Sequence, residues 1–380
     1  MDLTESPAEA SFRAEAREWL AQNVPQNPLP SGDTREGFEQ HLQWERTLHA
    51  ARWSVVSWPA AYGGRDASVW EWLAFEEEYY RAGAPQRVTQ NGIFLLAPTL
   101  FAFGTPEQQD RLLPRMSAAQ DLWCQGWSEP GAGSDLASLT SRAVRDEQAG
   151  GWRLSGQKTW TTRGAFCTHL FGLFRSDGES TRHHGLTYFL VPLNADGVTV
   201  RGFARLDGDE GFAEVWLDDV FVADDAVLGG VGEGWRVAMA TTGSERGLTL
   251  RSPGRFTATV DRLVQLARER GADGSLRARI AQAWMDAEAY RLFTLQQVTA
   301  TTNGRERQGE SSLNKLFWSE LDIRLHEVAL DLLGPEAELD GPWSKGFLFS
   351  LSGPIYAGTN EVQRNIVGER LLGLPRAGRT

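Results

Sequence analysis

The spacing of apolar residues changes twice along the 380-residue chain. Up to about residue 120, apolar side chains recur every three to four positions, as in Phe12, Ala16 and Leu20. This period is typical of amphipathic helices. We expect helices that include residues 36–50 and 70–82.

From about residue 122, glycine becomes frequent and short β-branched or aromatic runs alternate with turn residues. The runs cover residues 152–154, 169–174, 186–192, 198–203 and 213–217. Strands that follow one another every 8–12 residues or so predict an antiparallel sandwich or barrel.

Helical spacing returns after Gly234. The expected helices cover residues 235–250, 254–270, 275–302, 312–333 and 359–372. Gly334 and Pro335 should end the fourth of them, because glycine is common just past a helix and proline cannot continue one. The predicted fold is α+β, with an N-terminal helical domain (1–120), a central antiparallel β-barrel or sandwich (121–229) and a C-terminal helical bundle (230–380).

Composition narrows the possible partners. The chain has 38 Lys+Arg and 50 Asp+Glu, a net charge of −12, which argues against nucleic acid or anionic membranes as partners. The longest apolar stretch, residues 92–104, contains Pro98 and is too short for a membrane span, and the acidic N-terminus is unlike a signal peptide. We therefore expect a cytoplasmic protein with no membrane span, in which Cys124 and Cys167 are free thiols. The six histidines show no metal-ligand spacing, so no metal site is expected.

Two segments carry candidate ligand chemistry. In the run from Trp127 to Asp135, two glycines let the backbone approach a ligand, and Ser128 and Ser134 supply hydroxyls. An ordinary glycine-rich turn explains this run equally well. In the run from Gln157 to Thr162, an indole between hydroxyls suits a planar ring, but a strand with one core tryptophan is the alternative.

A charged pair, Glu245 and Arg246, lies ten and eleven positions after Trp235. At helical periodicity both fall near the apolar face of the expected helix. Charges there are costly unless they are paired or functional, so the pair is either catalytic or a structural ion pair.

Several motifs in this order resemble the acyl-CoA dehydrogenase family. They are Phe103–Gln108, Ser128–Asp135 (SEPGAGSD), Gln157–Thr162 (QKTWTT) and Tyr356–Arg364 (YAGTNEVQR). The resemblance covers nearly the whole chain. It implies an FAD enzyme of fatty acid metabolism that converts an acyl-CoA thioester to a trans-2-enoyl-CoA and passes electrons to an electron-transfer flavoprotein.

The resemblance also implies roles for single residues. The positions matched to flavin contacts are Gln125, Trp127, Ser128, Gly133, Ser134, Trp160, Thr161, Thr162, Thr359 and Glu361. Ser134 and Arg246 match positions that contact the CoA substrate.

The sequence departs from the family at the catalytic base. The commonest base is a glutamate in the last motif, where this chain has Ala357. Some branches of the family instead carry the base directly before the helix arginine, which here is Glu245. We expect Glu245 to be the base; the alternative is that it only pairs with Arg246.

A second departure lies at the positions that match the adenosine end of the cofactor, where the chain reads DLLGP over residues 331–335.

Relatives imply a homodimer or homotetramer, and some bacterial relatives work as two-subunit pairs. Two other functions stay open at this stage: a flavin oxidase or monooxygenase on the same scaffold, and a non-catalytic partner subunit of a two-subunit dehydrogenase.

Overall fold

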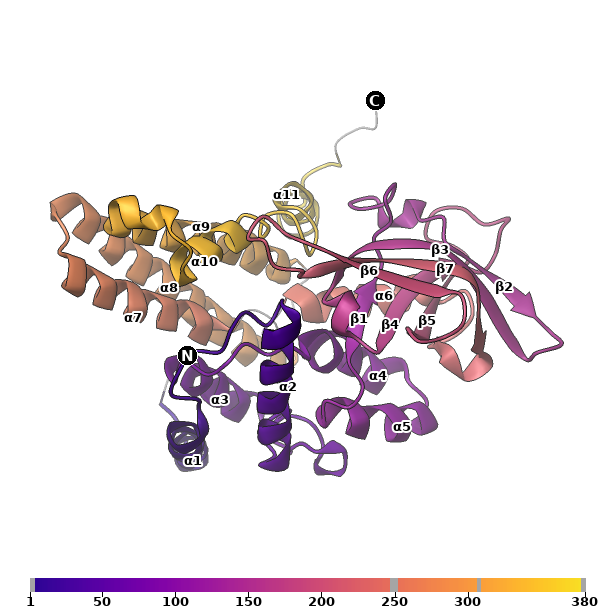
Figure 1. Ribbon diagram of the computed structural model, residues 1–380, viewed down its shortest axis with the longest axis horizontal. Helices are drawn as coiled ribbons and strands as arrows, with labels where there is room; N and C mark the ends of the chain where they lie inside the picture. The colour runs from indigo at the N-terminus through magenta and orange to yellow at the C-terminus, as the bar shows by residue number, and fades with distance from the viewer. Residues whose placement is uncertain (1–3, 247–251, 306–308, 377–380) are drawn as a thin grey trace. The chain divides into compact units, whose positions relative to one another are not determined.

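The computed structural model describes residues 4–246, 252–305 and 309–376 (Figure 1). The chain forms two compact units, each assembled from separate segments. The helical unit comprises Met1–Pro25, Ser68–Ala84 and Arg246–Thr380; the sheet unit comprises Gln26–Ala67 and Pro85–Glu245. Helices precede and follow the strands as predicted, whereas the domain boundaries at residues 120 and 229 stay a prediction.

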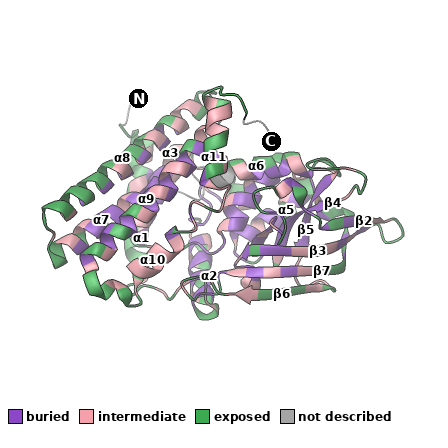
Figure 2. Ribbon diagram, turned by 90° about the horizontal axis from the view of Figure 1, so that it is seen from above, coloured by how far each residue is buried: buried purple, intermediate pink, exposed green. Residues whose placement is uncertain are grey.

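Seven α-helices of the described chain lie in the helical unit. They are α1 (Pro7–Asn23), α3 (Val69–Arg81), α7 (Pro253–Arg270), α8 (Gly274–Thr302), α9 (Glu310–Leu333), α10 (Pro342–Ser350) and α11 (Asn360–Ile366), with a π-helical turn, η7 (Val367–Leu371), after the last. A core built around Phe256, Leu263, Trp318 and Leu325 joins α7, α8 and α9. Figure 2 shows the buried stripe along α9 and the exposed edge of α8. As predicted, α9 ends at Gly334, which has a φ of +56°.

A buried carboxylate, Glu78, helps to fasten α1 to α3. Glu78 accepts hydrogen bonds from Arg13 (3.1 Å), Arg17 (2.9 Å) and Arg81. Burial alone would raise the pKa of Glu78, but the guanidinium groups outweigh it and lower the pKa to about 2.

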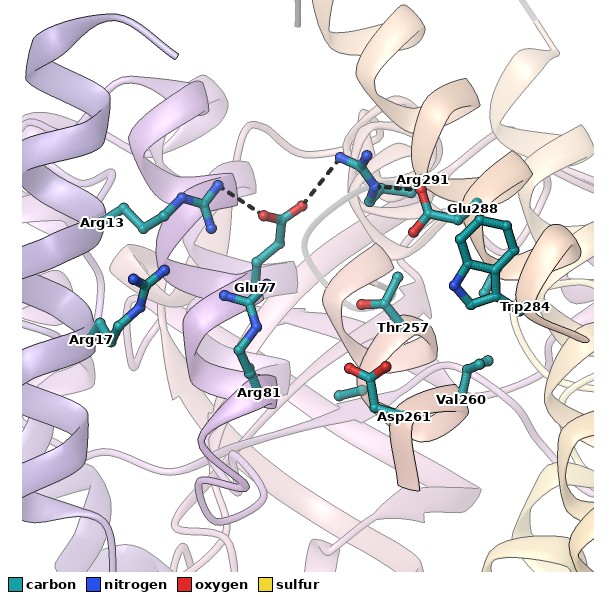
Figure 3. Close-up of a pocket in the computed structure, with 12 residues that line it drawn as sticks. Arg13, Arg17, Glu77, Arg81, Thr257, Val260, Asp261, Trp284, Glu288 and Arg291 are labelled. Carbon is teal, nitrogen blue, oxygen red and sulfur yellow. Dashed lines mark hydrogen bonds and ion pairs between the residues drawn. The ribbon is translucent and has the colours of Figure 1, made fainter. Parts of the chain in front are cut away.

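Beside this contact lies a cavity of about 420 Å³, lined by side chains of α1, α3, α7 and α8 (Figure 3). Glu77 lies between Arg13 (2.8 Å) and Arg291 (3.8 Å) and so links α1 to α8 across it.

The sheet unit contains one eight-stranded sheet. Its strands are β1 (Trp123–Gly126), β2 (Arg142–Asp146), β3 (Gly151–Thr162), β4 (His169–Arg175), β5 (Leu186–Pro192), β6 (Val198–Phe203), β7 (Phe212–Ala223) and β8 (Val227–Leu228). The order is β6-β7-β3-β2-β4-β5-β8, and β1 pairs with β4. Most pairings are antiparallel, but β1 and β2 each pair in parallel with β4, so the sheet is mixed.

Helices accompany the sheet within this unit. They are α2 (Arg35–Ala50), α4 (Ala97–Phe103), α5 (Pro106–Ser117), α6 (Gly234–Arg246) and a π-helix, η2 (Asn91–Leu96). Thr105 caps α5, and its hydroxyl accepts the Gln108 N–H at 3.2 Å. No helix in the described ranges is both long and apolar enough to cross a bilayer.

We expect the Glu78→Gln substitution to lower the free energy of unfolding by about 2 kcal/mol, because three guanidinium groups lose the carboxylate between them. The control is Arg17→Gln, since the Arg17 side chain is 60% exposed and its pairing should contribute less than about 1 kcal/mol. Urea denaturation followed by circular dichroism measures both losses. Equal losses would contradict a shared anchoring role for Glu78.

Candidate functional site

The glycine-rich segment from Ser128 to Asp135 folds against the end of β3. Glu129 and Ala132 exchange two backbone hydrogen bonds, of 2.9 and 3.0 Å, which close the segment into a tight turn. The Thr159 N–H donates to the Ser128 carbonyl at 2.9 Å. Two motifs that are separate in the sequence therefore lie side by side in the sheet unit.

A buried ion pair holds this contact. Lys158 Nζ lies 2.8 Å from Glu129 Oε1 and also donates to the Leu173 carbonyl at 2.8 Å. The Lys158 side chain is completely buried and that of Glu129 is 4% exposed. A charge in such surroundings is tolerated only when it is paired and hydrogen-bonded.

The Glu129 carboxylate has further donors. The Ser141 N–H donates to Oε1 at 2.9 Å, while the N–H and hydroxyl of Thr140 donate to Oε2 at 2.6 and 2.8 Å. Burial alone would raise the pKa of Glu129, but Lys158 and these donors lower it to about 2. The carboxylate is therefore ionised across the physiological pH range.

The end of β3 presents Trp160 to solvent. Trp160 has a left-handed backbone (φ +59°) at a register shift between Lys158 and Thr161, and it is 60% exposed. Its ring meets the rings of Phe203 and Phe212 edge-on, with centroid distances of 5.3 and 5.6 Å. Of the two interpretations of this motif, a core tryptophan in an ordinary strand is wrong, because the indole is largely uncovered.

The next two residues differ in what they can offer a ligand. Thr161 is completely buried, and its hydroxyl donates to the Ala213 carbonyl at 2.7 Å. Thr162 is half-buried and pairs with Phe212 of β7. Only the second of the two threonine side chains is accessible to a ligand in this unit.

A second group of candidates follows β1. Gln125 and Ser128 are half-buried, while Gly133 and Ser134 are exposed in the glycine-rich turn. A side chain added at Gly133 would meet no atom within 4 Å, so the backbone there is open to a ligand. Trp127 is buried, and its Nε1 has no acceptor among the residues that the structure describes.

These features fit an FAD ring. A flavin needs a flat apolar surface and donors near its polar edge, and an uncovered indole beside half-buried hydroxyl and amide groups supplies both. The Trp127 Nε1 is a buried donor that lacks an acceptor, which is uncommon unless a ligand or water completes it.

The last motif lies in the helical unit. The Thr359 hydroxyl caps α11 by accepting the Val362 N–H at 3.3 Å. Glu361 is exposed, and its pKa is lowered by its own backbone N–H and by the Thr359 hydroxyl. Ala357 adopts a left-handed backbone (φ +57°), and the Gln363 amide donates to its carbonyl at 2.9 Å.

The proposed base and CoA-binding arginine lie at the end of α6. The buried residues of α6 include Val237, Ala238 and Thr241, whereas Met239 is 40% exposed. The side chains of Glu245 and Arg246 lie outside the described residues.

Several contributors were not predicted from the sequence. Glu129 and Lys158 belong to recognised motifs, but neither motif alone indicates that they pair. The polar sequence around Lys158 gives no sign that its side chain is buried. Phe203 and Phe212 contact the Trp160 ring, but in the sequence they look like ordinary apolar strand residues.

The charge on Glu129 should make stability depend on pH. Because the folded-state pKa (about 2) is below the ordinary value of 4.5, the stabilising contribution is present above pH 4.5 and is lost as the pH falls from 4.5 towards 2. Thermal unfolding of wild type and Glu129→Gln measures this dependence. We expect a difference in melting temperature that is constant near neutral pH and shrinks below pH 4.5. A difference in melting temperature that does not change with pH would contradict a stabilising role for the Glu129 charge.

Comparison with known proteins places the chain. Its residues 6–120, 124–220 and 232–372 match the sequence models of the acyl-CoA dehydrogenase N-terminal, middle and C-terminal domains. It is 42% identical to acyl-CoA dehydrogenase IpdE1 of Mycobacterium tuberculosis over 96% of this chain and 97% of that protein.

Solved structures agree. A structure described as the Tcur3481-Tcur3483 steroid ACAD is 27% identical, with a TM-score of 0.89 over 99% of this chain and all of that one. The ChsE4-ChsE5 complex from M. tuberculosis is 27% identical, with a TM-score of 0.83 over 99% of this chain and all of that one. The chain therefore belongs to the acyl-CoA dehydrogenase family of FAD-dependent oxidoreductases.

Proposed function

We propose that this enzyme catalyses the α,β-dehydrogenation of an acyl-CoA thioester to a trans-2-enoyl-CoA, with an electron-transfer flavoprotein as the next acceptor. The observation that carries the proposal is the uncovered Trp160 ring at the end of β3, next to Thr159, whose N–H bonds the glycine-rich turn, and to Lys158, which pairs with Glu129 of that turn. This arrangement supplies a flat surface and donors suited to a flavin.

The flavin contacts in this proposal are those that the family resemblance implies. Trp127, Ser128, Trp160 and Thr162 would contact the ring, with Gln125, Gly133 and Thr161 close by; Thr359 and Glu361 would contribute from the last motif. Ser134 and Arg246 would bind the CoA arm. When bound, FAD accepts the hydride that leaves the substrate β-carbon.

The chain itself supplies the base. We assign that role to Glu245, whose carboxylate would take the proton from the substrate α-carbon. Glu245 stands directly before Arg246, the position that carries the base in some branches of the family. Ala357 cannot accept a proton at the alternative position.

The relatives support a narrower proposal for the substrate class and the assembly. Solved neighbours described as a steroid ACAD and as the ChsE4-ChsE5 complex support a steroid-derived acyl group and a second, different subunit. A homotetramer, a role in fatty acid metabolism and a cytoplasmic location stay predictions from the sequence.

Anaerobic reduction of the bound flavin tests the proposal. Straight-chain and steroid-derived acyl-CoA thioesters are added to the purified flavoprotein, and loss of flavin absorbance is followed by stopped flow. We expect faster bleaching by the steroid-derived thioesters. Glu245→Gln should slow bleaching by about 100-fold or more while flavin stays bound.

The matched control is Glu233→Gln, because Glu233 lies just before α6 with its side chain 53% exposed and paired to Arg236 at 2.8 Å. It should bleach like wild type. Unchanged bleaching in Glu245→Gln would exclude Glu245 as the base. A flavoprotein that no thioester bleaches but that consumes oxygen would favour an oxidase, and a chain that binds no flavin would favour a partner subunit.

A further inference from the structure

A buried carboxylate, Asp33, joins two segments of the sheet unit that are far apart in the sequence. Its Oδ1 lies 2.7 Å from Arg163 Nε and its Oδ2 lies 2.8 Å from Arg205 Nη1. Asp33 and Arg163 are each 3% exposed, and the Arg205 side chain is 11% exposed. One acidic group therefore holds two guanidinium groups away from solvent.

The first segment continues directly from the Trp160–Thr162 segment. Arg163 has a left-handed backbone (φ +55°), a conformation that is unfavourable for residues other than glycine. Its N–H donates to the Gly211 carbonyl at 2.9 Å, and its carbonyl accepts the Phe166 N–H at 2.9 Å. Arg163 therefore makes the turn that ends β3, and its ion pair with Asp33 helps to hold that backbone conformation.

The second segment is the hairpin between β6 and β7. Arg205 organises it, because its N–H donates to the Asp209 carbonyl at 2.9 Å and its guanidinium pairs with Asp207 at 2.8 Å. The guanidinium also packs on Gly211, where an added Cβ would lie 2.3 Å from Arg205 Nη1.

This hairpin begins after Phe203 and ends before Phe212, the two rings that support Trp160. Both segments joined by Asp33 thus determine where the Trp160 ring lies. Asp33 is the carboxylate that Arg163 and Arg205 share, and Arg205 also pairs with Asp207. Without Asp33, the buried Arg163 guanidinium would lose this ion pair at the turn.

We propose that Asp33 is a positioning residue for the flavin: it fixes the turn at Arg163 and the β6–β7 hairpin so that the Trp160 ring is held ready for the cofactor. This inference rests on the proposed contact of Trp160 and Thr162 with the flavin. Asp33 itself would touch neither flavin nor substrate.

The test is the affinity of the full chain for FAD, measured on protein freed of flavin by titration of flavin fluorescence. Asp33→Asn keeps the shape of the side chain but removes its charge. We expect its Kd for FAD to rise by about tenfold or more, with an altered visible spectrum of the bound flavin.

The matched control is Glu45→Gln. Glu45 is 1% exposed and lies in the same unit, where it pairs with the buried Arg87 at 2.8 Å and accepts the Thr89 N–H at 3.3 Å. It should lose comparable thermal stability and keep its FAD affinity within about twofold. This control separates a general loss of stability from an effect on flavin binding.

A double variant tests whether the turn at Arg163 causes the expected loss of FAD affinity. Asp33→Asn combined with Arg163→Gly removes the uncompensated guanidinium, and glycine adopts the left-handed backbone at no steric cost. We expect it to recover most of the FAD affinity lost in Asp33→Asn, and it replaces the single variant if that one does not fold.

Two results would overturn the inference. Wild-type FAD affinity in Asp33→Asn, with lowered stability only, would show a purely structural role, and no recovery in the double variant would show that the turn at Arg163 is not what Asp33 fixes. Failure of the wild-type chain to bind FAD would instead overturn the proposed function, and this inference with it.

Discussion

The buried ion pair between Glu129 and Lys158 is the constraint on which the rest of the site depends. It connects the glycine-rich turn to β3, and β3 ends in the Trp160–Thr162 segment. Removing two charges from water is costly, and four further hydrogen bonds offset that cost. Thr140 donates two and Ser141 one to Glu129, and Lys158 donates one to the Leu173 carbonyl. This hydrogen-bonded pair favours one arrangement of the two motifs, because a shift of either motif would leave a buried charge without its partner.

A second buried ion pair lies near the irregular backbone at the end of β3. Trp160 and Arg163 both have positive φ, and buried carboxylates lie close to each: Glu129 beside Lys158 and Asp33 beside Arg163. Ion pairs are directional, unlike apolar contacts, so they can fix a bend that hydrophobic packing alone would leave free. An exposed aromatic surface therefore rests on a rigid polar framework, an arrangement that suits a ligand site prepared before the ligand binds.

Apolar periodicity in the sequence predicts the regular elements well. The run at residues 186–192 has the bounds of β5, and the helix expected at 275–302 is α8 to within one residue, because a long stripe of one period leaves little choice. Pairings between distant segments could not be predicted. Nothing in the sequence indicates that β1 runs parallel to β4 or that Asp33 meets Arg163, since both depend on tertiary contacts. The motif around Trp160 indicates a ligand site. The exposure of the Trp160 side chain, however, depends on its left-handed backbone, which residue propensities do not predict.

The most direct measurement is a double-mutant cycle on FAD affinity, using Glu129→Gln, Lys158→Met and both together. If the pair holds the two motifs in place, each single variant should bind FAD about tenfold more weakly or worse, because an uncompensated charge is left buried. The double variant should lose much less than the sum of the two, since its charges are removed together. Wild-type affinity in both single variants, despite lowered stability, would contradict the account: the flavin site would then form without the pair.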